Sequence, residues 1–195
     1  MIRLSGNIQP MDMTDQNDMV DYVIEPLTFK YLLPALRLVD SVFPRREQGG
    51  ERADLAFTAS LLTLGRRVAK WMGYPMVRYW IVRDVATNRI YGTIGHYVRA
   101  DDPDAYWGGW MCVDPRARGL GIGKKLINFV VGESVRRGDR PYHRFYTSTD
   151  PNEAKAVAMY NRACFNVYKQ ECDPVTGYTR LYYQVRLDDV TLPVL

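Results

Sequence analysis

Three alternating glycines among cations form the stretch of this chain that is best suited to binding an anionic ligand. Gly119, Gly121 and Gly123 lie between an apolar, strand-like segment that ends at Val113 and an amphipathic run that begins at Ile122. A strand, a glycine turn and a helix N-terminus together offer unpaired backbone N–H groups and the positive end of a helix dipole. Glycine has no side chain to keep a ligand away from the backbone. The stretch is therefore predicted to bind a pyrophosphate.

Spacing excludes two familiar phosphate-binding patterns. A Walker A loop ending in Gly123-Lys124 would need glycine at position 118 and a hydroxyl residue at position 125, but the chain has Arg118 and Lys125 there. The dinucleotide fingerprint needs Gly-x-Gly-x-x-Gly in the first strand–helix–strand unit. Here the spacing is Gly-x-Gly-x-Gly, and it follows three strands that are predicted to be antiparallel. Neither nucleotide-binding pattern fits.

A third pattern, Arg/Gln-x-x-Gly-x-Gly/Ala, fits the residues from Arg118 to Gly123. The flanking Val113, Pro115 and Leu126 agree with it. On these residues the chain resembles the Gcn5-related N-acetyltransferase (GNAT) superfamily over roughly residues 77–187, and the order of its predicted elements matches that family. The central motif of the family binds the pyrophosphate of acetyl-CoA, so the resemblance implies acetyl-CoA as the co-substrate.

The resemblance also implies roles for the strand before the loop. Its backbone would bind the pantetheine arm as a partner strand does, and the Gly108-Gly109 pair would open the sheet to admit it. The amides of the loop would hold the pyrophosphate. The expected cofactor-binding residues are Met111, Cys112, Val113, Arg118, Gly119, Leu120, Gly121, Ile122, Gly123 and Lys124. Arg116 and Lys125 would add charge, or they are ordinary surface cations.

A second group of residues supplies the expected catalytic side chain. Ala156, Tyr160 and Phe165 keep the register of the family pattern Asn-x-x-Ala-x-x-x-Tyr followed by Gly-Phe, although Glu153 replaces the Asn and Cys164 the Gly. Coenzyme A leaves as a thiolate, whose thiol has a pKa of about 8.5, and a phenol of pKa about 10 protonates it or donates a hydrogen bond. Tyr160 is therefore expected to be catalytic, the alternative being a packing role. Glu153 is predicted to bond back to Asp150 as a helix cap.

The attacking amine must be neutral, and for a lysine-like amine deprotonation at pH 7 costs about 4–5 kcal/mol. Candidate bases are His96, Tyr106 and His143, but none is assigned, because a lone histidine among core positions is commonly structural. Two charged segments offer hints about the acceptor. An acidic turn near aromatic residues would attract a cationic amine or is simply solvated, and three arginines would favour an acidic acceptor. These residues are Asp101, Asp102, Asp104, Tyr106, Trp107 and Trp110, and Arg45, Arg46 and Arg52.

The resemblance implies an N-acetyltransferase that moves the acetyl group of acetyl-CoA to a primary amine by direct attack in a ternary complex. The alternative is a non-catalytic acyl-CoA-binding regulatory module of the same fold. The acceptor is expected to be a small-molecule or peptide amine, and antibiotics, polyamines, amino acids and protein N-termini all stay open. Longer acyl chains also stay open.

Apolar periodicity predicts the elements that position these residues. Helices are expected over residues 32–43, 53–71, from the loop to 137, and 151–163, and strands over 22–27, 77–83, 90–98, 105–113, 142–148, 165–169 and 178–187. In the long 53–71 helix, the residues assigned to the core are Leu55, Leu61, Leu62, Leu64 and Val68. The fold class is α/β (α+β), with a mixed, mostly antiparallel sheet flanked by helices. Residues 1–19 are predicted to be an N-terminal arm, and residues 20–195 one domain.

Composition sets the remaining bounds. The 195 residues are 47% hydrophobic and 25% charged, typical of a globular domain, and a net charge of +4 is too small to indicate nucleic-acid binding. No apolar run or N-terminal signal indicates a membrane partner or export. Three cysteines without paired spacing predict a reduced, cytoplasmic protein. Two histidines and no Cys-x-x-Cys give no reason to expect a metal. A homodimer is left open.

Overall fold

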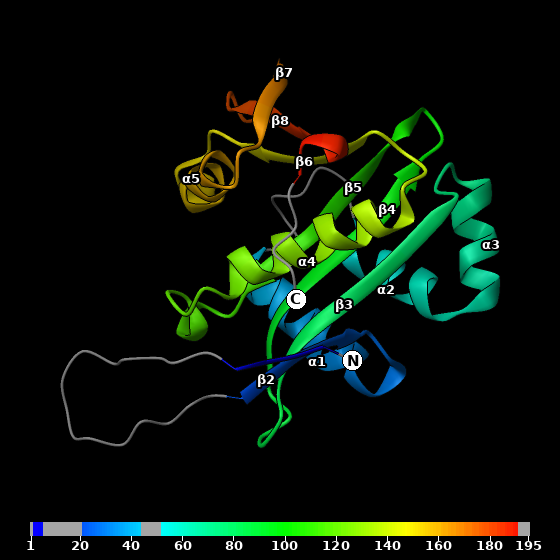
Figure 1. Cartoon of the computed structure of the whole chain (residues 1–195), viewed down its shortest axis with the longest axis vertical. Helices are drawn as coiled ribbons and strands as arrows, with labels where there is room; N and C mark the ends of the chain where they lie inside the picture. Colours follow the sequence, from blue (N-terminus) through cyan, green and yellow to red (C-terminus); the bar gives the residue numbers. More distant parts are fainter. Residues whose placement is uncertain (1, 6–20, 44–51, 191–195) are drawn as a thin grey trace.

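The computed structural model describes residues 2–5, 21–43 and 52–190. Its centre is one eight-stranded sheet in the order β1-β2-β3-β4-β5-β6-β8-β7, with helices on both faces (Figure 1). Every neighbouring pair is antiparallel except β5 and β6, which are parallel. The predicted fold class is therefore confirmed.

The strands are β1 (Ile2–Ser5), β2 (Asp21–Pro26), β3 (Met76–Asp84), β4 (Ile90–Arg99), β5 (Asp102–Val113), β6 (Tyr142–Ser148), β7 (Asn166–Cys172) and β8 (Thr179–Arg186). The helices are α1 (Phe29–Val42), α2 (Ala53–Leu61), α3 (Thr63–Trp71), α4 (Ile122–Arg137) and α5 (Ala154–Arg162). Strand β1 was not predicted, and it pairs with β2. The other residues of the predicted N-terminal arm, 1 and 6–19, lie outside the described residues. No helix in the described ranges has the length and apolar character to cross a membrane.

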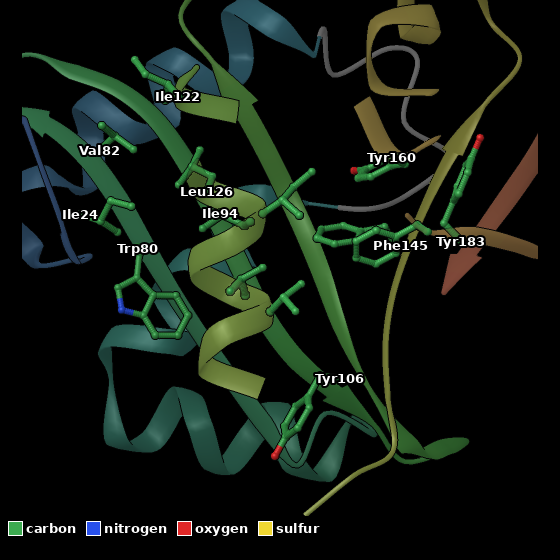
Figure 2. Close-up of a cluster of buried hydrophobic side chains, with 14 of the residues drawn as sticks. Ile24, Trp80, Val82, Ile94, Tyr106, Ile122, Leu126, Phe145, Tyr160 and Tyr183 are labelled. Carbon is green, nitrogen blue, oxygen red and sulfur yellow. The ribbon is translucent and has the colours of Figure 1, made fainter. Parts of the chain in front are cut away.

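Two apolar cores lie on opposite faces of the sheet. On one face, α4 inserts Leu126 and Val130, which are fully buried, against Ile94 of β4 and Phe145 of β6 (Figure 2). On the other face, α1 packs against β4 and β5 and α2 packs against β3, with Phe57 of α2 fully buried. Because the buried stripe of α4 recurs at helical spacing, it fixes the helix on the sheet and thereby places its N-terminus at the end of β5. Gly138 (φ 64°) ends α4, as its sequence position predicts.

The predicted single helix over residues 53–71 is wrong in one respect, since the chain breaks at Leu62. That residue is extended (φ −93°, ψ 135°), and it separates α2 from α3. The two helices then pack closely at Gly65, where a Cβ atom would lie 2.8 Å from the Cα atom of Ala59. The break turns α3 away from the core, so four of the five residues assigned to the core are exposed. These are Leu55 (56%), Leu62 (41%), Leu64 (70%) and Val68 (47%).

Strand β5 contains a bulge next to its two glycines. Thr93 of β4 faces Cys112, whereas Gly95 faces Gly109, so one residue of β4 opposes two residues of β5. Within this bulge Trp110 has a positive φ of 47°. Gly108 is required by a close approach, because a Cβ atom there would lie 1.9 Å from the ring of Phe145. The glycine pair therefore lies at both a bulge and a close approach of the β5 backbone to Phe145.

Two histidines are buried beneath α4 and share one hydroxyl group. The Oγ atom of Ser134 lies 3.0 Å from Nε2 of His96 and 2.7 Å from Nδ1 of His143, and it donates to the carbonyl oxygen of Val130. Since its one proton is given to Val130, both histidines donate to Ser134, which assigns their neutral tautomers. Burial lowers the pKa of His143 to about 3 and that of His96 well below its ordinary value.

We predict that this pair makes the fold sensitive to mild acid. Unfolded histidine binds a proton below pH 6.5 and buried His143 does not, so the free energy of unfolding falls as the pH drops from 6.5 towards 3. For His143 alone the loss between pH 7 and pH 5 is about 2 kcal/mol. Urea unfolding at both pH values measures it. In His143→Gln, whose side-chain amide still donates to Ser134, the loss is smaller by that amount, and an equal loss in both proteins would contradict the assignment.

Candidate functional site

The glycine loop joins β5 to α4 and ends at an open helix N-terminus. Gly119 (φ 88°) and Gly121 (φ 74°) adopt left-handed conformations that favour glycine, and Gly121 caps α4. A Cβ atom at either position would meet nothing within 4 Å. The first turn of α4 has no acidic residue, while Arg118 and Lys124 are exposed beside it. The loop therefore combines the positive end of a helix dipole, an approachable backbone and flanking cations, which are the features that the predicted anion site requires.

Two other cations near the loop are held by the protein itself. Arg116 bonds to Asp114 at 3.3 Å through its guanidinium. The ammonium of Lys125 lies 4.7 Å from the ring centroid of Tyr22, on β2. Arg118 and Lys124 are thus better placed than Arg116 and Lys125 to contact a phosphate.

Asp114 anchors the start of the loop. It is buried, and its carboxylate accepts hydrogen bonds from the backbone and side chain of Arg116 and from Arg89 at 2.8 Å. Burial alone would raise the pKa of Asp114, but these donors outweigh it and lower the pKa to about 2. Arg89 belongs to the β3–β4 turn, so that turn supports the loop. Sequence reasoning did not identify this contact, because no motif spacing links Arg89 to Asp114.

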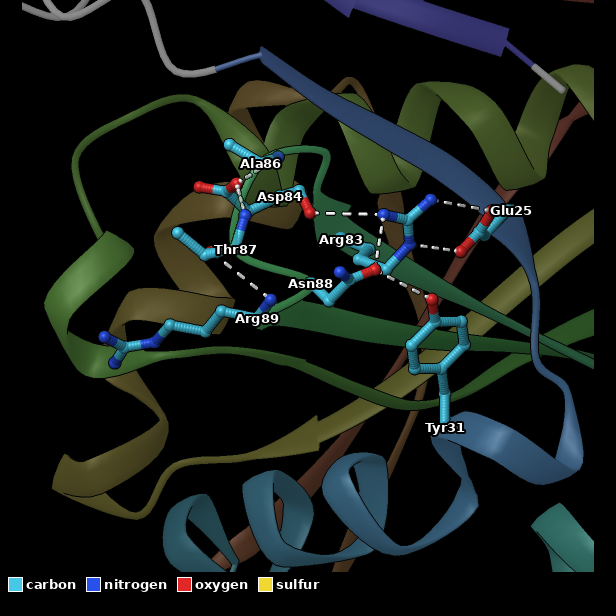
Figure 3. Close-up of polar contacts among 8 residues, drawn as sticks. All are labelled: Glu25, Tyr31, Arg83, Asp84, Ala86, Thr87, Asn88 and Arg89. Carbon is cyan, nitrogen blue, oxygen red and sulfur yellow. Dashed lines mark hydrogen bonds and ion pairs between the residues drawn. The ribbon is translucent and has the colours of Figure 1, made fainter.

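The β3–β4 turn is itself tied together by polar contacts (Figure 3). The carboxylate of Asp84 accepts from the backbone N–H groups of Ala86 and Thr87, each at 2.8 Å. Arg83 bonds to Glu25 of β2 and to Asn88, whose amide oxygen also accepts from Tyr31 of α1. These contacts fix the turn from which Arg89 reaches Asp114.

Strands β5 and β6 pair over three residues of each strand and then diverge. Residues Ala105 to Trp107 pair with Tyr142 to Arg144, and beyond Trp107 no strand in the described ranges pairs with this edge of β5. Met111, Cys112 and Val113 lie in the divergent part (Figure 1). The opening that the glycine pair predicted is therefore present. Its exposed backbone edge is suited to bind an extended amide-bearing chain as a partner strand.

Side chains alternate along this part of β5. Met111 and Val113 pack against the α4 core, and Cys112 is buried on the opposite face beside Thr93. Burial raises the pKa of the Cys112 thiol to about 11, so it remains a neutral thiol. Only the backbone of Cys112 is therefore available for the binding role that the resemblance implies.

Tyr160 of α5 lies across the opening from β5. It is 4% exposed, and its ring stacks on Phe145 with centroids 4.8 Å apart. Figure 2 shows its hydroxyl directed toward β5, whereas that of the neighbouring Tyr183 points away. Within the described part of the chain the Tyr160 hydroxyl forms no hydrogen bond. Burial, and then the nearby Glu153 and Tyr183, raises the pKa of Tyr160 above its ordinary value, so the phenol stays protonated.

The third glycine of the loop brings three elements together. A Cβ atom at Gly123 would lie 3.0 Å from the sulfur of Met159 on α5 and 3.6 Å from the terminal methyl of Met111 on β5. Gly123 thus serves packing, whereas Gly119 and Gly121 serve backbone conformation. The arrangement places the helix that carries Tyr160 directly against the start of α4.

Both departures from the family pattern have structural explanations. Cys164 adopts a positive φ of 60°, the conformation that a glycine takes without strain. The predicted side-chain bond from Glu153 back to Asp150 is wrong, because the Glu153 carboxylate accepts from the backbone N–H and hydroxyl of Ser148 at 2.8 and 3.0 Å, and from Thr147. Glu153 therefore links α5 to the end of β6.

The candidate bases lie away from the opening. Tyr106 and His143 face each other in the paired part of β5 and β6. Tyr106 donates to Asp139, and both histidines are bonded to Ser134 beneath α4. Since none of the three belongs to the divergent part of the strands, no general base is assigned.

Charges proposed for acceptor recognition are mostly compensated. Asp101 pairs with Arg99 at 2.5 Å, and Asp102 pairs with Arg144 and accepts from the indole of Trp107. Arg52 pairs with Asp54, while positions 45 and 46 lie outside the described residues. In the described ranges no group of three His, Cys, Asp or Glu side chains gathers as a metal site would need.

Comparisons with solved structures show the fold. A GNAT-family acetyltransferase from Desulfovibrio desulfuricans has a TM-score of 0.66 and 17% identity over 85% of this chain and 99% of its own. The ribosomal-protein-S18-alanine N-acetyltransferase from Escherichia coli has a TM-score of 0.61 and 13% identity over 89% and 99% of the two chains. A chimeric spermidine N-acetyltransferase from Vibrio cholerae and hSSAT has a TM-score of 0.61 and 15% identity over 86% and 96%.

Comparison with protein families gives the assignment itself. No curated protein sequence matches the chain, but residues 75–166 match the family described as "Acetyltransferase (GNAT) domain". The matched residues run from the start of β3 to the start of β7 and include the glycine loop, the divergent strands and Tyr160. The resemblance seen in the sequence is confirmed: residues 75–166 of this chain match the GNAT acetyltransferase domain.

Proposed function

We propose that this protein is an N-acetyltransferase that transfers the acetyl group of acetyl-CoA to a primary amine by direct attack in a ternary complex. One observation carries the proposal: the opening between β5 and β6 is bordered by an anion-binding helix N-terminus at one end and by the Tyr160 hydroxyl on its side. These are the two ends of one co-substrate, a pyrophosphate and a thioester.

The described residues suit acetyl-CoA along its length. The amides from Arg118 to Lys124 would bind the pyrophosphate at the N-terminus of α4, with Arg118 and Lys124 adding positive charge. The backbone of Met111, Cys112 and Val113 would bind the pantetheine amides. Tyr160 would then face the thioester sulfur across the opening.

The amine attacks the thioester directly. The nitrogen lone pair of the neutral amine attacks the thioester carbonyl carbon, the C–S bond of the tetrahedral intermediate breaks, and the electron pair leaves on sulfur. The ammonium formed on nitrogen loses its proton to solvent. Because the pKa of Tyr160 is raised, full proton transfer to a thiolate is unfavourable, and the phenol stabilises the leaving sulfur as a hydrogen-bond donor.

The acceptor is proposed to be a small-molecule or peptide amine. Structures of similar fold include enzymes named for an alanine of ribosomal protein S18 and for spermidine. The ion pairs of Asp101 and Asp102 leave little uncompensated acidic charge for a polycation at the β4–β5 turn. The structural evidence therefore does not favour a polyamine over a peptide amine.

The experiment that tests the activity is an acceptor panel with acetyl-CoA, followed by release of free thiol. Amino acids, polyamines, aminoglycosides and peptides with free N-termini are each supplied in turn. Amine-dependent thiol release supports the proposal. Tight acetyl-CoA binding with no thiol release from any amine would instead support a non-catalytic acyl-CoA-binding regulatory module, and failure to bind any coenzyme A species would refute both functions.

We predict that Gly121→Ala weakens acetyl-CoA binding about tenfold or more, because the new methyl group occupies the open space before α4 and strains the amides that bind phosphate. Calorimetric titration measures the affinity. Gly177→Ala is the matched control, since Gly177 has the same φ of 74° and the same open surroundings in the β7–β8 turn. Both variants lose about 1–2 kcal/mol of stability. Equal affinities for acetyl-CoA would contradict the pyrophosphate assignment.

We also predict that Tyr160→Phe lowers kcat about 10- to 100-fold and leaves the acetyl-CoA dissociation constant unchanged. The ring still stacks on Phe145, and only the hydrogen bond to the leaving sulfur is lost. Steady-state kinetics with the best amine of the panel measures the effect. Tyr183→Phe, which removes a hydroxyl pointing away from the opening, is expected to keep kcat. A wild-type kcat in Tyr160→Phe would reduce Tyr160 to a packing residue.

A further inference from the structure

Helix α3 exposes an apolar row that the fold does not cover. Leu64, Val68 and Trp71 follow one another at spacings of four and three residues, and so they share one face of the helix. Their side chains are 70%, 47% and 89% exposed, and the adjoining Met72 is 59% exposed. Only Ala69 of this helix is buried. Soluble domains rarely place such a row on the surface without a binding partner.

The charge around this row has a single sign. Arg66, Arg67 and Lys70 are exposed on α3. From residue 55 to residue 83 the chain contains five cations and no aspartate or glutamate. Helix α3 is therefore strongly amphipathic, with large apolar side chains on one face and cations beside them. Its apolar face is turned outward, the reverse of a surface helix that packs on its own core.

We propose that α3 docks on the surface of an anionic lipid bilayer. An interfacial helix of this kind buries a row of apolar side chains among the lipid headgroups, while its cations attract the anionic lipids. The exposed indole of Trp71 has the amphipathic character favoured at that depth. The charge complementarity thus points to a negatively charged surface, and the proposal replaces the sequence-based expectation that no membrane is a partner.

A second copy of this chain fits the surface less well. A two-fold interface brings the same patch of both copies together. Here it would gather Arg66, Arg67 and Lys70 of both copies in one interface, and residues 55–83 supply no acidic residue to pair with them. An acidic protein is the remaining occupant. The bilayer is favoured because a single short apolar row with exposed cations beside it is the arrangement of an interfacial helix.

Docking through α3 leaves the acetyl-CoA site accessible. The end of α3 is attached to the end of β4, where the backbone N–H of Ala100 donates to the carbonyl of Gly73 at 2.7 Å. That is the end of the sheet at which β5 begins, and the glycine loop follows the other end of β5. Figure 1 shows α3 on the opposite side of the molecule from the loop that precedes α4.

The test is flotation of the full chain with two kinds of vesicle, phosphatidylcholine alone and phosphatidylcholine with phosphatidylserine. We expect binding to the anionic vesicles that weakens with added salt. The double variant Leu64→Ser with Trp71→Ser is expected to reduce the partition coefficient about tenfold or more. Val175→Ser is the control, since Val175 is 91% exposed in the β7–β8 turn. Unchanged acetyl-CoA binding shows that each variant is folded.

A blue shift of tryptophan fluorescence on addition of vesicles gives a second readout. In Trp71→Phe we expect this shift to be lost, whereas the protein still floats with the anionic vesicles. Equal binding to both kinds of vesicle, or binding that the double variant retains, would overturn the proposal. So would a chain that binds neither vesicle. If the protein binds no vesicle and forms a dimer that the double variant abolishes, a second copy of the chain covers α3. If it binds no vesicle and is monomeric, the partner of α3 is an acidic protein.

Discussion

The opening between β5 and β6 depends on where one aromatic ring is packed. Phe145 projects from β6 over Gly108 of β5, where no larger residue leaves room for its ring. The same ring stacks on Tyr160, so it sets both the separation of the strands and the position of the hydroxyl beside the opening. The bulge at Trp110 then changes the register of β5 just beyond this contact. A packing constraint in the core thus produces the shape of the site.

The electrostatics of the site come from the backbone more than from side chains. The N-terminal end of α4 has no acidic residue in its first turn, and the helix is held in place by Leu126 and Val130. Asp114 adds negative charge nearby, but Arg89 and Arg116 neutralise it and use it to anchor the loop. The carboxylate therefore stabilises the loop without opposing a bound phosphate.

Much of this was predictable because it follows from local rules. Glycines with positive φ, the cap at Gly138 and the period-two strands are encoded in short stretches, and the spacing from Arg118 to Gly123 indicated the family resemblance. Contacts across the fold were not predictable. The break at Leu62, the partner of Glu153 and the link from Arg89 to Asp114 depend on which elements become neighbours. The apolar residues of α3 were assigned to the core because periodicity identifies an apolar face but not the surface it meets.

The packing around Gly123 has an evolutionary consequence. Position 123 has no backbone need for glycine, and the room it leaves is taken up by the sulfur of Met159. A larger residue at 123 becomes tolerable once position 159 shrinks, so the two positions are expected to change together as the sequence diverges. Gly119 and Gly121 have no such partner side chain, and no second substitution restores what they lose. The loop therefore contains two kinds of glycine. Gly123 can be replaced if position 159 changes with it, whereas Gly119 and Gly121 cannot be replaced through a second substitution.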